Sequence, residues 1–197
     1  MPRDMNSFRE CLREETADIH EQADREFAGL DLTERQGLST FLMTIHAVMN
    51  HLEQVIKRDA MVEDSTISLV PTLVDDLRHD LAALGVSSTD MGWQPTNNGP
   101  LDPLAIGYVV QGSRLGTAMM AKHWATTTDP MVKQAGRYMS SRIDTRDWKA
   151  LQADLADIEV GCARANKISE DVKSLFEMHM TAYASALENI EKSPAVA

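Results

Sequence analysis

The segment LREETADIHEQAD, Leu12–Asp24, lies within a helical pattern that runs from about residue 7 to residue 27. Apolar residues recur there at steps of three and four, which predicts one apolar stripe along an amphipathic helix. Thr16, His20 and Asp24 follow one another at four-residue steps and form a second row beside this stripe. A histidine in that row can turn one ring nitrogen inward and donate the other to Asp24, as a metal-ligating imidazole requires. The alternative interpretation is a half-buried helix histidine with an incidental neighbour, and spacing alone favours it.

Amphipathic patterns continue through most of the remaining chain, and no segment alternates as a strand would. The sequence therefore predicts an all-α fold of about seven helices. One domain is expected over residues 1–192, with a flexible tail at 193–197. Segment 85–102 predicts one long loop, either a rim or lid of a site or a connector. The predicted helix starts are a capping box at Thr33–Gln36, Pro71, Asp102–Pro103, Asp129–Pro130 (a helix reaching about Ser141), Thr145 and Ser169.

Composition narrows the class of protein. The 197 residues carry a formal net charge of -11, which argues against a nucleic-acid partner because phosphate binding needs clustered Lys and Arg. Two cysteines are too few for a disulfide framework or a cysteine-rich zinc site. The polar start MPRDMNSFRE does not resemble a signal peptide, and no apolar run approaches a membrane span. We therefore expect a cytoplasmic protein with no membrane partner.

A second unusual stretch begins at Pro103 and reads PLAIGYVVQGSRLGTAMMAKHWA. It predicts a helix that is apolar on most sides and is interrupted by Gly107, Gly112 and Gly116. Each glycine inside a helix costs about 1 kcal/mol relative to alanine, so three of them need a reason. A kink, a close helix crossing, or backbone that passes directly over a flat ligand would each supply one.

The histidine stretch resembles the first helix of the haem oxygenase family, particularly the bacterial biliverdin-forming enzymes. That helix reads approximately L-R/K-x-x-T-x-x-x-H, and this chain has Leu12, Arg13, Thr16 and His20 in the same register. Family members place an acidic residue one turn after the histidine, commonly Glu, and here it is Asp24.

The glycine-rich stretch GYVVQGSRLGTAMMA resembles the distal helix of the same family, Y-V-x-x-G-S-x-L-G-G. Gly112, Ser113, Leu115 and Gly116 match this motif. The chain departs from it at Thr117, where the family usually has a second consecutive glycine. A side chain there would crowd the oxygen site, tilt the haem, or supply a hydroxyl. The two stretches occur in the family order, about ninety residues apart, and the all-α pattern extends the resemblance over essentially the whole chain.

The resemblance implies haem b as both cofactor and substrate, held between the two helices. His20 would be the iron ligand, and Asp24 would orient its ring and raise its basicity. Arg13 matches a basic family position that pairs with a haem propionate, and Thr16 belongs to the same haem-binding stretch.

On the distal side the resemblance assigns the catalytic residues Gly112, Ser113, Gly116 and Thr117. Glycine backbone would pass close above the porphyrin, and Ser113 stands where many animal members have a catalytic Asp. The implied activity is O2- and electron-dependent cleavage of haem to biliverdin, carbon monoxide and iron. Its partners would be O2 and an electron donor such as ferredoxin or a flavin reductase, and the acidic chain suits a basic donor.

Other functions remain open from the sequence. A non-catalytic haem-binding or haem-sensing protein of the same fold would keep the haem and lose turnover. A thiaminase-like enzyme or a di-iron oxidase could share the helical architecture, but a di-iron site needs Glu-x-x-His pairs on facing helices. The second predicted helix offers only His51-Leu52-Glu53, which has the wrong spacing. No sequence feature speaks positively for a plain helical interaction module.

Overall fold

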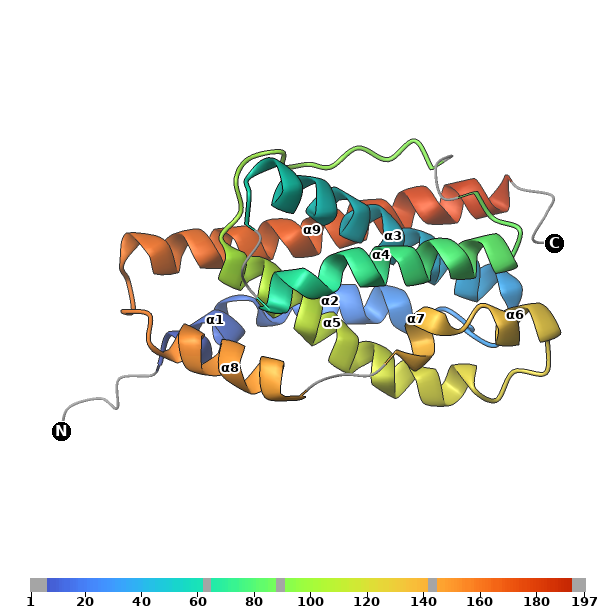
Figure 1. The fold of residues 1–197 in the computed structure, drawn as a ribbon, viewed down its shortest axis with the longest axis horizontal. Coiled ribbons are helices and arrows are strands. Elements are labelled where there is room, and N and C mark those ends of the chain that lie inside the picture. The colour runs from blue at the N-terminus through green and yellow to red at the C-terminus, as the bar shows by residue number, and fades with distance from the viewer. Residues whose placement is uncertain (1–6, 62–64, 88–90, 142–144, 193–197) are drawn as a thin grey trace.

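The architecture was examined in a computed structural model, which describes residues 7–61, 65–87, 91–141 and 145–192. These residues form nine α-helices and no strand, so the predicted all-α class is confirmed for them (Figure 1). The predicted tail at 193–197 lies outside the described residues. The helices are α1 (Phe8–Glu15), α2 (Ala17–Ala28), α3 (Arg35–Arg58), α4 (Ser65–Ala83), α5 (Pro103–Trp124), α6 (Pro130–Gln134), α7 (Arg137–Ser140), α8 (Thr145–Ala156) and α9 (Ala163–Glu191).

Helix α9 runs along the long axis of the molecule (Figure 1). α3, α5 and α2 all pack on α9, and α4 packs on α3. α1 and α8 pack together at the end of the molecule where the chain begins. Buried apolar side chains from α1 and from α3 to α9 form one core, against which Phe27 of α2 packs from its edge. Ala23 is the single buried residue of α2, so this helix lies at the margin of the core.

The first predicted helix is interrupted at Thr16, and the expectation of one helix over residues 7–27 is wrong at this point. Thr16 has φ -106° and ψ 2°, which ends α1 before α2 begins. Its hydroxyl donates to the carbonyl of Leu12 at 2.7 Å, and its backbone N–H reaches the same oxygen at 3.1 Å. A hydroxyl that competes for the carbonyl four residues earlier favours a bend in a helix, although Thr117 makes the same bond in the unbroken α5.

Two other predicted helix starts are displaced. α4 begins at Ser65 and contains Pro71, because buried Ile67 and Val70 extend its apolar face toward the N-terminus. α9 begins at Ala163, with the sulfur of Cys162 accepting a hydrogen bond from the Ala165 N–H at 3.3 Å. Ser169, the expected cap, is a buried residue inside α9. The Asp102–Pro103 and Thr145 starts are confirmed, and the Asp102 side chain accepts from the Leu104 N–H.

The proposed capping box at residues 33–36 is also wrong. The N–H and hydroxyl of Thr33 both donate to Asp31 Oδ1, at 2.9 and 2.7 Å. Thr33 therefore stabilises the turn that follows α2. α3 begins after Glu34, which makes no side-chain cap bond.

The helix predicted from Asp129 to about Ser141 is two short helices, α6 and α7, separated at Gly136. The fully buried carboxylate of Asp80 accepts the N–H groups of Arg137 and Tyr138 at 3.0 and 2.8 Å. Burial raises the pKa of Asp80, while these two hydrogen bonds oppose the rise. This long-range cap fixes the start of α7, and nothing in the local sequence indicates it.

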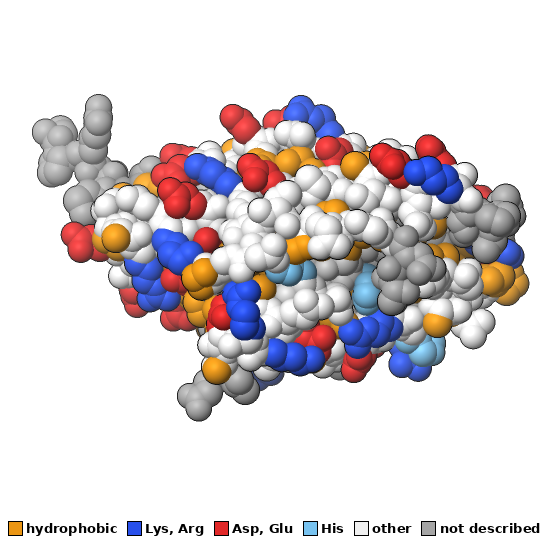
Figure 2. Space-filling model, turned by 90° about the horizontal axis from the view of Figure 1, so that it is seen from above, with side chains coloured by type: hydrophobic (Ala, Val, Ile, Leu, Met, Phe, Trp, Pro, Cys, Tyr) orange, Lys and Arg blue, Asp and Glu red, His pale blue; other side chains and the backbone are white. Residues whose placement is uncertain are grey.

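The described part of the long loop lies across α3 and α9. His51 Nε2 is 3.1 Å from the carbonyl oxygen of Asn97, and the Trp93 indole donates to Thr181 of α9 at 3.0 Å. On the face seen from above in Figure 2, acidic and basic side chains are interspersed, and hydrophobic side chains form small separate spots. Of the two roles left open for the loop, its contacts through Asn97 and Trp93 support a connector.

None of the helices in the described residues combines the length and apolarity that crossing a bilayer requires.

Candidate functional site

The imidazole of His20 is paired with Asp24 on α2. His20 Nδ1 lies 3.0 Å from Asp24 Oδ2, and the two side chains are 53% and 70% exposed. An Nδ1–H that donates to Asp24 leaves Nε2 with its lone pair, the form in which histidine ligates a metal. The described residues form no hydrogen bond to Nε2. An exposed pair at this spacing contributes only about 0.3–0.5 kcal/mol, so Asp24 by itself holds the ring weakly.

A second contact to the imidazole comes from α9. The rings of His20 and Phe176 lie 5.3 Å apart, centroid to centroid, at an interplanar angle of 69°. Edge-to-face aromatic pairs contribute about 0.5–1.5 kcal/mol beyond the area they bury. Phe176 therefore adds a second contact, from another helix, that helps to hold the imidazole. No local sequence pattern indicates this contact, because Phe176 is far from His20 in the chain.

The other two predicted haem-binding residues of this stretch are placed differently. Thr16 is buried in the break between α1 and α2, and its hydroxyl donates to the carbonyl of Leu12. Arg13 is exposed on α1, so the break separates it from the helix that carries His20. The structure thus brings His20 and Asp24 together and leaves Arg13 and Thr16 outside that pair.

The glycines of α5 divide into two groups. Gly107 is buried in the first half of the helix. A Cβ atom added to Gly112 or Gly116 would meet nothing within 4 Å. A close helix crossing therefore does not explain these two glycines, although it was one of the three reasons the sequence left open. α5 continues unbroken from Pro103 to Trp124, with open space beside both residues.

The hydroxyls predicted for the distal side are bonded to α5 itself. Ser113 Oγ donates to the carbonyl of Val110 at 2.9 Å, and Thr117 Oγ1 donates to the carbonyl of Ser113 at 2.8 Å. Thr117 is 3% exposed, in contrast to the exposed Gly116 beside it. Its side chain therefore belongs to the packed side of α5.

One face of α5 connects this open space to the end of α2. Gly112, Gly116, Met119 and His123 follow at steps of three and four and so share a face, which we call the glycine face. His123 Nε2 lies 3.2 Å from Oδ1 of Asp31, in the turn after α2. Met119 is 74% exposed. The glycine face is therefore turned toward the α2 side of the molecule at its C-terminal end, and both helices pack on α9.

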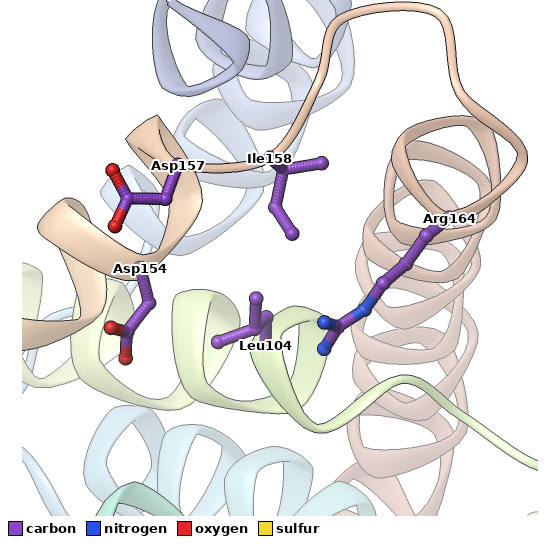
Figure 3. A pocket seen from close by; sticks show the side chains of 5 residues that line it. All are labelled: Leu104, Asp154, Asp157, Ile158 and Arg164. Atoms are coloured by element: carbon purple, nitrogen blue, oxygen red, sulfur yellow. The ribbon is translucent and has the colours of Figure 1, made fainter.

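A separate surface depression lies where the start of α5, the end of α8 and the start of α9 meet (Figure 3). It has a volume of about 350 Å³ and is lined by Leu104, Asp154, Asp157, Ile158 and Arg164. Figure 3 shows the Arg164 guanidinium turned toward Leu104, and Arg164 Nε donates to Asp102 at 2.9 Å. No residue predicted for the haem site lines this depression. Its charged residues Asp154, Asp157 and Arg164 are close together in the chain, and only Leu104 comes from a distant segment.

Within the described ranges, no group of three or more His, Cys, Asp or Glu side chains is placed to share a metal ion. Comparison with protein-family models gives no match for this sequence, and comparison with curated protein sequences gives none either.

Proposed function

We propose that this protein is a haem oxygenase that binds haem b between α2 and the glycine face of α5. The observation that carries the proposal is the open space beside Gly112 and Gly116. Two glycines inside a helix destabilise it, and packing within the protein gives no compensation at these positions. A flat ligand that needs close approach to the backbone supplies the missing reason.

The residues present fit haem b on the α2 side. A single neutral imidazole nitrogen is sufficient as a protein ligand to haem iron. With a proton on Nδ1 directed to Asp24 at 3.0 Å, Nε2 of His20 would be such a nitrogen. The side chain is half exposed and thus accessible to a ligand. Asp24 would fix the tautomer and raise the basicity of the ring, as carboxylates do beside ligating histidines.

Haem, when bound, supplies the iron that activates O2 and is also the molecule that is cleaved to biliverdin, carbon monoxide and iron. The protein's task is then to position and to shield. His20 would hold the iron side, and Gly112 and Gly116 would admit the porphyrin because neither has a side chain. The protons of Ser113 and Thr117 are held by the carbonyls of Val110 and Ser113, so proton delivery on that side falls to water.

An electron donor completes the proposal. Ferredoxin or a flavin reductase would supply the electrons, and the formal net charge of -11 favours a donor with a basic docking surface. This association would weaken with added salt, because exposed charges are screened over about 10 Å at 0.1 M ionic strength.

The test is a titration of the full chain with ferric haem, followed by reductant and air. Stoichiometric uptake and replacement of the Soret band by biliverdin absorbance support the enzyme. A stable complex that never yields biliverdin would instead favour the haem-binding or haem-sensing alternative, for which Thr117 in place of the family glycine is the one specific feature. Failure to take up haem would contradict both.

A further inference from the structure

Two aromatic contacts of nearly the same geometry join α9 to α2. Phe176 lies 5.3 Å from the His20 ring at 69°, and Tyr183 lies 5.5 Å from the Phe27 ring at 67°. Phe176 and Tyr183 are seven residues apart and therefore project from the same face of α9. Both are partly buried. If these contacts served only to attach α2, the two aromatic residues would be equivalent.

They differ in what they touch. Phe27 is an apolar side chain that also packs against Phe41 of the core, at 5.7 Å between ring centroids. His20 has no aromatic neighbour other than Phe176 among the described residues, and its ring is half exposed. Its hydrogen-bond partner Asp24 is 70% exposed and can exchange that bond for water. This hydrogen bond directs Nδ1 toward Asp24, but it does not prevent the imidazole from rotating into solvent.

We propose that Phe176 is a positioning residue for His20. The Phe176 ring, which belongs to a second helix, restricts rotation of the imidazole, while Asp24 sets the tautomer. The two contacts together keep the imidazole in one orientation before any ligand arrives, with Nδ1 on Asp24 and Nε2 free to bind a ligand. A ligand atom then meets a ring that is already oriented, which lowers the entropy lost on binding. The consequence for iron ligation rests on the proposed function, whereas the orientation of the ring does not.

The first part of the test uses the full chain without haem. Long-range 1H–15N spectra of 15N-histidine-labelled protein report the tautomer of His20, and side-chain relaxation reports its mobility. Phe176→Leu is expected to make the His20 ring mobile and to lower the share of the Nδ1–H tautomer. Tyr183→Leu, the matched control, is expected to leave both unchanged. Equal behaviour of the two variants would overturn the proposal.

The second part measures ferric haem binding. Phe176→Leu is expected to weaken haem affinity about tenfold, within the range seen when partners of a metal-ligating histidine are lost. It is also expected to shift the iron–histidine stretching band of the ferrous complex. Tyr183→Leu should stay within about twofold, and Phe176→Tyr should restore the wild-type band because it keeps the ring. Matched thermal unfolding of the two leucine variants would show that global stability does not cause the difference.

The two parts separate this inference from the proposed function. If the wild-type protein takes up no haem, the proposed function fails and the 15N spectra alone decide the role of Phe176. If the wild-type protein binds haem through His20 but Phe176→Leu and Tyr183→Leu have the same affinity and band position, the positioning role fails and the proposed function stands.

Discussion

Helices α2 and α5 carry the two halves of the candidate site in opposite ways. On α2 the site is a side chain, the His20 imidazole, directed by Asp24 and by Phe176 of α9. On α5 it is the absence of side chains, because Gly112 and Gly116 have open space where a Cβ atom would lie. A ligand with one coordinating atom and one flat face needs both.

The two helices also differ in how firmly they are embedded. α5 is buried along much of its length up to Thr117, whereas α2 buries only Ala23. The helix that carries His20 is thus the one with the weaker attachment to the core. Local stability follows buried contacts, so we expect α2 to open more readily than α5 in the haem-free protein. A ligand held between them would stabilise α2 most.

The largest expected effect comes from removing the side chain on α2. His20→Ala should weaken ferric haem binding more than about 100-fold, because ligation itself is lost rather than its orientation. The absorption spectrum of the bound ferric haem should change, and added imidazole should restore the wild-type spectrum. His79→Ala serves as the control, since His79 lies on α4, outside both helices of the proposed site. An unchanged ferric haem spectrum in His20→Ala would show that α2 does not supply the iron ligand.

The next effect comes from adding a side chain on α5. Gly116→Leu should leave the haem-free protein as stable as the wild type or more stable by up to about 1 kcal/mol, since leucine is the better helix former and nothing obstructs it. Haem affinity should nevertheless fall by about 1–3 kcal/mol, which is on the order of tenfold to hundredfold. Urea unfolding and haem titration measure the two quantities.

Ala118→Leu is the matched control for that experiment, because Ala118 is exposed on the same helix but lies off the glycine face. It should leave haem affinity unchanged. Equal losses in Gly116→Leu and Ala118→Leu would mean that the glycine face has no special relation to the ligand.

A smaller effect is expected from the partner of His20. Asp24→Asn should weaken haem affinity roughly tenfold, the lower end of the range for partners of metal-ligating histidines, because the pair is exposed. Asp18→Asn changes an exposed carboxylate on the same helix and should have no such effect. If both variants bind haem equally well, Asp24 is an incidental neighbour of His20.

The smallest effect on the ligand is expected at Thr117. Its buried side chain and its bond to Ser113 predict a structural role. Thr117→Gly should lower the free energy of unfolding by about 1–2 kcal/mol, from the lost buried methyl group and the added helix glycine. Turnover should be kept or increased. A large loss of turnover at unchanged haem affinity would give the threonine a positive catalytic role.

Local pattern was sufficient to predict the helical class, the Asp102–Pro103 start and the His20–Asp24 pair, because these depend on residues one turn apart. It failed where distant residues decide. Asp80 caps α7 from another helix, and Phe176 reaches His20 across the fold. The break at Thr16 is not revealed by the helical periodicity, which continues through this residue. The open space beside Gly112 and Gly116 depends on how the helices pack. The sequence alone therefore could not choose among a kink, a close helix crossing and a flat ligand as the reason for these glycines.

Hydrogen exchange of the full chain with and without ferric haem tests the central claim most directly. The account predicts new protection in α2, residues 17–28, and along α5 from residue 112 to residue 123, with the larger gain in α2 because it starts less buried. Protection confined to residues 154–164, around the depression of Figure 3, would place the ligand elsewhere and contradict the account. Unchanged exchange at saturating haem would contradict it as well.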